Sequence, residues 1–141
     1  MSNNQIRAYA AMQAGEQLVP YQFDAGELQA HQVEVKVEYC GLCHSDLSVI
    51  NNDWRSSTYP VIAGHEIIGT ITALGTEAKG LKLGQRVGIG WTAESCQACD
   101  PCIGGNQVLC TGENVATIVG HAGGLCRKST GWLAMGYSST R

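Results

Sequence analysis

The 141-residue sequence has no run of lysine or arginine, and its formal net charge is −3. Proteins that bind nucleic acid or anionic membranes usually carry a basic patch, so both classes of partner are disfavoured. The sequence also lacks a stretch of about 18 apolar residues, which argues against a transmembrane helix. Its first residues, MSNNQIRAYAAMQ, lack the basic start and apolar run of a secretory signal. We therefore expect a cytoplasmic protein.

Cysteine, by contrast, is abundant, with seven residues in the chain. Structural disulfides are disfavoured in a reducing compartment, so crowded cysteines indicate metal binding first. Cys96, Cys99, Cys102 and Cys110 follow a C-x2-C-x2-C-x7-C spacing. Four thiolates on one loop can enclose a tetrahedral Zn²⁺ without an open position, which makes a structural site. An iron–sulfur cluster is a competing interpretation, although the ferredoxin run ends in C-x3-C-P, and chance thiols or disulfides are the remaining one.

The pattern of apolar residues predicts a small, mostly antiparallel β domain. In the segment 32–39, valines alternate with charged residues, which is typical of a half-buried strand. The other candidate strands cover residues 6–12, 18–24, 66–75 and 83–91. Only the segment 44–52 predicts a short helix, with His44 or Ser45 near its start.

A second cluster of chemically active residues comprises Cys43 of CGLCHSD with His65 and Glu66 of AGHEIIG. Each of them alone is a weak signal, because a lone histidine before a strand is more often a hydrogen-bonded core or surface residue. Together, a thiolate, an imidazole and a carboxylate at strand edges resemble an open catalytic zinc site.

These motifs in this order resemble the zinc-dependent medium-chain alcohol dehydrogenases, and the likeness is closest to the cinnamyl-alcohol-dehydrogenase-like branch. The likeness runs from about Ile6 to Gly124. It implies a mainly β fold: a GroES-like, partly open β-barrel with a few short helices and a structural zinc lobe. In the family, this domain carries both zinc ions and is followed by a Rossmann domain that binds NAD(P).

The resemblance also implies roles for the residues around Cys43. Cys43 and His65 would bind the catalytic zinc, whereas Cys40 would be a packed thiol that binds no metal. Glu66 would lie in or just behind the ligand shell as a transient ligand. Asp46 would accept a hydrogen bond from His65 and so fix the tautomer of the imidazole.

Three further roles follow from the same resemblance. Ser45 would pass the alcohol proton, His44 would face the cofactor pyrophosphate, and Trp54 would form a wall of the substrate pocket. On the residues alone, helix N-terminal capping explains Ser45 and Asp46 as well as these functional roles do, and ordinary packing is the simpler interpretation of Trp54. Ser48 stands where some relatives have a relay histidine, which puts the outer part of the proton relay in doubt.

The implied reaction interconverts a primary alcohol and an aldehyde by hydride transfer with NAD(P)(H), assisted by zinc. Its partner is a small-molecule alcohol or aldehyde, with aromatic and medium-chain aldehydes and NADPH favoured by analogy with the branch. No nucleic acid and no membrane are expected as partners, and an oligomer is compatible with the resemblance.

The family's third zinc ligand and its glycine-rich nucleotide-binding turn are not found, so we expect an incomplete GroES-like domain over 1–124 and no Rossmann domain. Residues 125–141 lack alternation and resemble no family segment. We expect the barrel's closing strands, and the face that packs on the Rossmann domain in the family, to be exposed. Several codons can encode each residue of this tail. With one permitted choice of codons, removing the first base shifts the reading frame, and the shifted frame encodes a strand like that of the family. We therefore interpret the tail as the product of a frameshift near Leu125. Cys126 is not expected to replace the missing ligand.

The whole pattern predicts a truncated alcohol dehydrogenase without turnover of its own. The alternative is a free-standing zinc-binding β domain with a structural or interaction role. A zinc-ribbon-like nucleic-acid module is a third interpretation, disfavoured by the acidic net charge and by the few aromatic residues near the cysteines.

Overall fold

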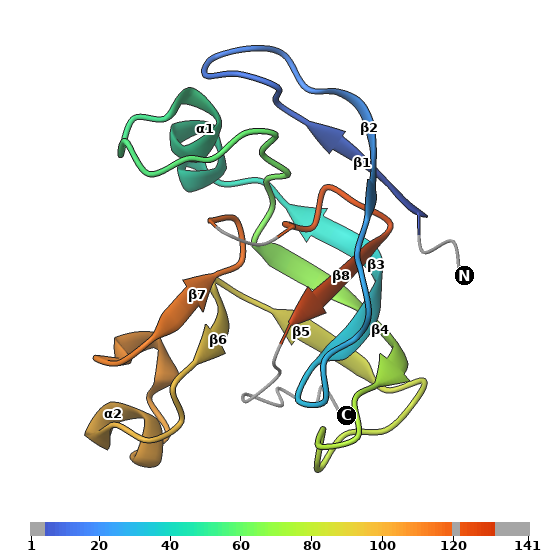
Figure 1. Ribbon diagram of the computed structural model, residues 1–141, viewed down its shortest axis with the longest axis vertical. Coiled ribbons are helices and arrows are strands. Elements are labelled where there is room, and N and C mark those ends of the chain that lie inside the picture. Colours follow the sequence, from blue (N-terminus) through green and yellow to red (C-terminus); the bar gives the residue numbers. More distant parts are fainter. Residues whose placement is uncertain (1–4, 120–121, 132–141) are drawn as a thin grey trace.

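The computed structural model describes residues 5–119 and 122–131 (Figure 1). Its strands are β1 (Gln5–Ala10), β2 (Val19–Asp24), β3 (Val33–Gly41), β4 (Glu66–Leu74), β5 (Arg86–Ile89), β6 (Thr92–Ser95), β7 (Asn114–Ala116) and β8 (Lys128–Gly131). Its helices are α1 (His44–Asn51) and α2 (Asp100–Ile103), with a 3-10 turn, η1 (Gln107–Leu109). No helix within the described ranges is long and apolar enough to cross a bilayer.

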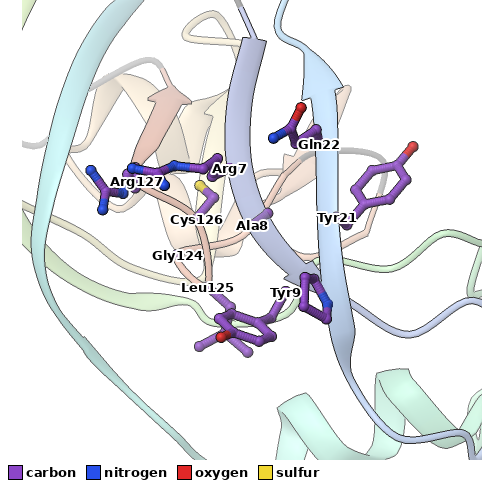
Figure 2. Close-up of a pocket in the computed structure, with 10 residues that line it drawn as sticks. Arg7, Ala8, Tyr9, Tyr21, Gln22, Gly124, Leu125, Cys126 and Arg127 are labelled. Carbon is purple, nitrogen blue, oxygen red and sulfur yellow. The ribbon is translucent and has the colours of Figure 1, made fainter.

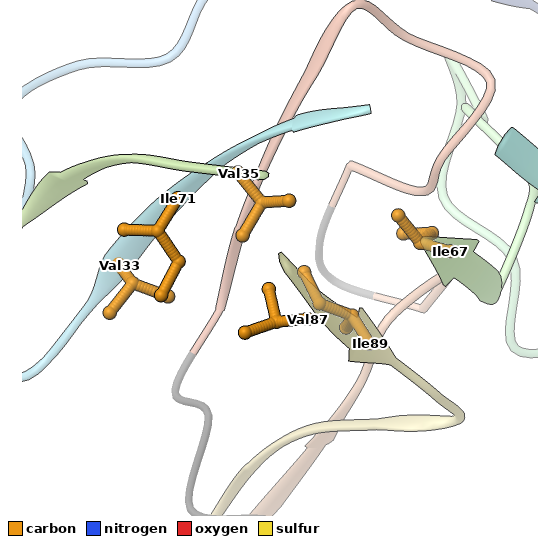
Figure 3. Packing of buried hydrophobic residues seen from close by; sticks show 6 residues of the cluster. All are labelled: Val33, Val35, Ile67, Ile71, Val87 and Ile89. Carbon is orange, nitrogen blue, oxygen red and sulfur yellow. The ribbon is translucent and has the colours of Figure 1, made fainter. Parts of the chain in front are cut away.

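The main core lies against a four-stranded antiparallel sheet with the order β5-β4-β3-β8. The alternation expected in the segment 32–39 places Val33 and Val35 of β3 on the buried face, where neither is exposed to solvent. Figure 3 shows the cluster that they complete with β4 and β5: Val33, Val35, Ile67, Ile71, Val87 and Ile89. Each such side chain contributes about 1.5–3 kcal/mol by leaving water, so this face stabilises the sheet.

The strands β1 and β2 form a hairpin, with antiparallel pairs from Gln5↔Asp24 to Ala10↔Val19. Ile6 and Ala8 of β1 pack with Ile62, from the segment before β4, in a second core cluster. The hairpin forms a sheet of its own, apart from the β5-β4-β3-β8 sheet.

A short segment of the tail joins these two sheets. The Tyr9 backbone N–H donates to the Leu125 carbonyl over 2.9 Å, and the Arg127 N–H donates to the Arg7 carbonyl over 3.0 Å. Directly afterwards, β8 pairs with β3 from Val33↔Gly131 to Lys36↔Lys128. The sequence did not predict this pairing of residues 125–131, and residues 132–141 of the tail lie outside the described residues.

The four-cysteine segment projects from the barrel as a lobe, here defined as residues 92–116. It contains the two-stranded β6-β7 sheet, α2 and η1, and Figure 1 shows it extending to one side of the central sheet. None of these short elements was predicted from the sequence. Their apolar residues Ile103, Val108 and Leu109 are 74%, 56% and 60% exposed, so they form no core of their own.

Candidate metal centres

The helix α1 begins at a thiol cap. Cys43 is the N-cap residue, and its Sγ accepts a hydrogen bond from the Ser45 backbone N–H over 3.4 Å. In return, the Cys43 N–H donates to Oδ2 of Asp46 over 3.0 Å, which completes a capping box. Capping is therefore a real role of Asp46, but Ser45, the other candidate cap, does not perform it. These hydrogen bonds hold Cys43 at the N-terminus of α1.

The second carboxylate oxygen of Asp46 reaches the other candidate ligand. Oδ1 lies 3.0 Å from Nδ1 of His65 and accepts a hydrogen bond from the Gly64 backbone N–H over 2.7 Å. Asp46 is only 2% exposed and His65 only 8% exposed. A proton on Nδ1 directed at this carboxylate leaves Nε2 as the lone-pair donor, the state that a metal ligand requires.

Cys43, Asp46 and His65 together form one compact group. Their potential ligand atoms all lie within 4.8 Å of one another, and no other histidine, cysteine or acidic residue of the described chain joins them. A catalytic zinc site usually has three protein ligands and one open position. Because Asp46 is engaged with His65 and the helix cap, the described residues fit two of those three ligands, namely Cys43 and His65.

Glu66 and Cys40 lie beside this group but outside it. Glu66 is exposed at the first position of β4 and is paired with Gly41 of β3. A Cβ atom on Gly41 would lie 2.2 Å from Oε2 of Glu66, so glycine leaves room for this carboxylate. Cys40 packs against the main core, and burial raises the pKa of its thiol. Glu66 as a transient ligand stays a prediction.

A tryptophan that sequence reasoning missed lies next to His65. The β4–β5 register pairs Ile67 with Ile89, and continuing it two residues places Trp91 opposite His65. The two ring centroids are 5.1 Å apart, edge to face. The ring centroids of Trp54 and Trp91 are 5.9 Å apart, also edge to face. Both indoles remain partly exposed, at 49% for Trp54 and 37% for Trp91, so they form an apolar wall that still faces outward.

The remaining predicted residues occupy the following places. His44 is exposed and Ser45 half-buried in the first turn of α1, so their roles with cofactor and proton stay predictions. Ser48, in the relay position, is buried at 6% exposure. Cys126 is buried below the β1–β2 hairpin, where its thiol donates to the Gly123 carbonyl, and it belongs to neither potential metal group.

The second potential metal group contains all four cysteines of the lobe. The Sγ atoms of Cys96 and Cys110 are 3.5 Å apart, while the pairs Cys96–Cys102 and Cys99–Cys110 are each 3.9 Å apart. A tetrahedron with Zn–S bonds of about 2.3 Å has sulfur–sulfur edges of about 3.8 Å. The four thiols therefore fit a structural Zn²⁺, with no position left for a substrate.

The surroundings of the four thiols in the lobe shift their pKa values in different directions. Hydrogen bonds from the backbone of Cys102 and Thr111 lower the pKa of Cys99 to about 5. Burial raises the pKa of Cys102 to about 11. Because thiolates are the zinc ligands, Cys99 is ready to bind at neutral pH, whereas Cys102 must release its proton to the solvent when metal enters.

The chain combines a partly open β-barrel, a thiol–imidazole pair and a separate lobe with four thiols. This combination is typical of the zinc-binding domain of alcohol dehydrogenases. Residues 29–134 match the family model described as "Alcohol dehydrogenase GroES-like domain". The chain belongs to this family. The match extends past Gly124, where the sequence resemblance was expected to end.

Similar proteins agree with this assignment. An aldehyde reductase from Synechocystis sp. is 48% identical over 120 residues, covering 84% of this chain and 35% of the relative. A cinnamyl alcohol dehydrogenase structure from Sorghum bicolor has a TM-score of 0.81 and 34% identity, covering 91% of this chain and 38% of that one. One from Helicobacter pylori, complexed with NADP(H), has a TM-score of 0.83 and 31% identity, with 91% and 39% coverage. The chain thus spans about a third of the length of these proteins.

Proposed function

We propose that the complete protein interconverts primary alcohols and aldehydes, with NAD(P)(H) as the hydride carrier and zinc as the Lewis acid. The observation that carries this proposal is the Asp46 carboxylate, which accepts a hydrogen bond from the Cys43 backbone N–H and lies 3.0 Å from Nδ1 of His65. The aldehyde reductase and cinnamyl alcohol dehydrogenase relatives support an aldehyde substrate. NADPH is preferred because the relative complexed with NADP(H) is 31% identical to this chain, more than the 25% of a neighbour complexed with NADH.

Each residue would act through its position. A zinc ion held by Cys43 and His65 would supply Lewis acidity, lowering the pKa of a substrate hydroxyl. Asp46 keeps the His65 tautomer fixed through its 3.0 Å contact with Nδ1. Ser45, in the first turn of α1, would accept the substrate's hydroxyl proton and release its own toward the solvent. Glu66 would serve as a transient ligand in or just behind the ligand shell. Trp54 and Trp91 would exclude water from one side of the substrate, and His44 would bind cofactor phosphate.

We also propose that this chain by itself has no turnover. Its described residues fit two zinc ligands, Cys43 and His65, and the match covers only 35% of the length of the aldehyde reductase relative. The test combines metal analysis with an NADPH-linked aldehyde reduction assay on the purified chain. About one tightly bound zinc without aldehyde reduction is the expected result. Reduction without an added partner would overturn the proposal of an inactive fragment.

A free-standing zinc-binding β domain remains the second candidate function. Two observations favour it: the lobe contains its complete ligand set, and the tail segment 125–131 is paired into the barrel. This candidate requires a monodisperse 141-residue product with an ordered C-terminal end. Size-exclusion chromatography and protection of amide hydrogens from exchange would measure both properties.

Two proposals concern the origin and location of the chain. The frameshift near Leu125 stays a proposal, and it would fail if the coding nucleotides, read in the shifted frame, gave no family-like strand. Cytoplasmic location is proposed because all seven cysteines are unpaired, as expected in a reducing compartment. Fractionation of the source cells would test the location.

A further inference from the structure

The junction between the hairpin and the tail places two arginines directly opposite each other. Ala8 and Cys126 form an antiparallel bridge, which sets Arg7 opposite Arg127 and Tyr9 opposite Leu125. The hydrogen bonds from Arg127 N–H to Arg7 and from Tyr9 N–H to Leu125 confirm this register. Like charges directly opposite on neighbouring strands are destabilising, so this pair costs stability unless an anion compensates it.

No carboxylate of the described chain compensates the two guanidinium groups by an ion pair. Two cations of the β5-β4-β3-β8 sheet do have such a partner: Arg86 lies 3.3 Å from Glu38, and Lys128 lies 3.0 Å from Glu34. Arg7 faces the neutral Gln22 on its other side. The nearest acidic residue along the hairpin, Asp24, lies one row further out and accepts a hydrogen bond from the Gly26 N–H.

The same register adds an apolar row next to the arginines. Residues two apart share a face of the sheet, so Pro20, Tyr9 and Leu125 form a row about 7 Å from the row of Gln22, Arg7 and Arg127. Both rows line a groove of about 650 Å³, and no acidic residue is among its lining residues. In Figure 2 both arginines lie at one end of this groove, and Tyr9 and Leu125 lie at the other.

We propose that this groove binds a small organic oxyanion, a carboxylate or phosphate carried on an apolar or aromatic body. Arg7 and Arg127 would hold the oxyanion through charge-assisted hydrogen bonds, for which planar guanidinium groups are suited. The body would lie along Tyr9, Pro20 and Leu125. The proposal concerns the chain as it stands, whatever the origin of its tail, and it is independent of the zinc chemistry. Cys43 and His65 do not line the groove.

The test is an NMR titration of the ¹⁵N-labelled 141-residue chain, zinc-loaded, at low ionic strength. Phenyl phosphate and benzoate are the probes, and phenol is the neutral control. Either anion is expected to shift the arginine side-chain N–H signals and the amides of β1, β2 and residues 124–127. Phenol is expected to shift none of them. Absence of these shifts with both anions overturns the proposal.

Variants separate binding at the groove from general attraction of anions. Arg7→Gln and Arg127→Gln each remove charge-assisted hydrogen bonds, so each is expected to weaken anion binding by about tenfold or more. Lys79→Gln, at an exposed position outside the groove, removes the same charge and is expected to leave binding unchanged. The amide spectrum reports in the same experiment whether each variant is folded. Equal weakening by Lys79→Gln, or undiminished binding in both arginine variants, contradicts the proposal.

Discussion

At the scale of single residues, Asp46 connects the two candidate zinc ligands. Sequence reasoning left two roles open for it, helix capping and orientation of His65. The structure shows both contacts, because one carboxylate has two oxygens: Oδ2 accepts from Cys43 and Oδ1 faces His65. The two interpretations competed only because a sequence does not assign individual oxygens to partners.

Replacing Asp46 with asparagine tests this double role. The asparagine NH₂ group can only donate, so at least one of the Cys43 and Gly64 N–H groups or the His65 Nδ1–H loses its acceptor. We expect a loss of about 1–3 kcal/mol in the free energy of unfolding, measured by urea denaturation. We also expect cobalt binding at Cys43 and His65 to weaken about 10- to 100-fold, as for other residues that orient metal ligands.

The exposed Asp53, just after α1, provides the control. Asp53→Asn is expected to leave both stability and cobalt binding unchanged. In both variants the zinc content of the four-cysteine lobe should be the same as in the parent chain. Unaltered cobalt affinity in Asp46→Asn would show that the carboxylate does not position the ligands.

Trp91 shows which site residues the sequence cannot supply. Its place beside His65 depends on the pairing of β4 with β5, because only the Ile67↔Ile89 register brings positions 65 and 91 together. The sequence does predict both strands, from residues 66–75 and 83–91. Aligning the apolar residues of the two predicted strands could have suggested their register and so the place of Trp91. The metal motifs are found more easily, because the spacing of their residues is local in the sequence.

Gly64 occupies a position beside the site where both the backbone conformation and the neighbouring atoms favour glycine. Its φ is +97°, and an added Cβ would lie 2.5 Å from the Cys40 sulfur and 3.0 Å from the Leu125 nitrogen. We expect Gly64→Ala to lower the free energy of unfolding by about 2–4 kcal/mol through backbone strain and steric overlap. Gly80→Ala is a matched control, since Gly80 has φ +77° but open space around it. A loss of only about 1 kcal/mol is expected there, and equal losses in thermal melts would show that overlap at Gly64 contributes nothing.

At the scale of elements, a strand was predictable where one face is buried. The alternating valines of β3 and the β-branched residues of β4 reflect the core beneath them. The segment of β8, KSTG, has no such pattern, and it is a strand because the edge of β3 supplies backbone partners to it. Pairing with an existing edge leaves no alternating pattern in the sequence, so no strand was predicted within residues 125–131.

The four-cysteine lobe should depend on metal for its structure. Its apolar residues face solvent, so zinc, worth on the order of 10 kcal/mol in small sites, replaces a core. We expect chelation to abolish amide protection in residues 92–116 while β3 and β4 stay protected, as measured by hydrogen exchange. Zinc affinity should fall as pH falls, because protons compete for the thiolates and Cys102, with its pKa raised to about 11, is the most readily protonated.

Cysteine variants separate metal binding by the lobe from other thiol effects. Cys99→Ser is expected to lose the tightly bound zinc, as measured by elemental analysis. Cys40→Ala changes a thiol that belongs to neither potential metal group and is expected to retain it. Retention of full zinc content by Cys99→Ser would contradict the four-thiolate site.

At the scale of the whole molecule, the chain is held together where its tail crosses between two sheets. Leu125 and Arg127 make four backbone hydrogen bonds to three parts of the molecule. Two join them to Tyr9 and Arg7 of the hairpin, one joins Leu125 to Ala63 near the candidate zinc ligands, and one joins Arg127 to Val37 of β3. The hairpin and the central sheet have separate core clusters, and Leu125 packs against the one that contains Ile6. The segment therefore links the hairpin, the candidate zinc site and the central sheet into one unit.

Two truncations test this link. A chain ending at Gly124 loses the four hydrogen bonds, worth together about 4 kcal/mol, and leaves one edge of β3 unpaired. We expect its unfolding to become less cooperative and, because an open strand edge pairs with other chains, its solutions to aggregate. A chain ending at Gly131 keeps every pairing described for β8 and is expected to unfold like the parent in urea. If the chain ending at Gly124 unfolds with the parent's midpoint and slope and stays monomeric, the tail segment does not hold the sheets together.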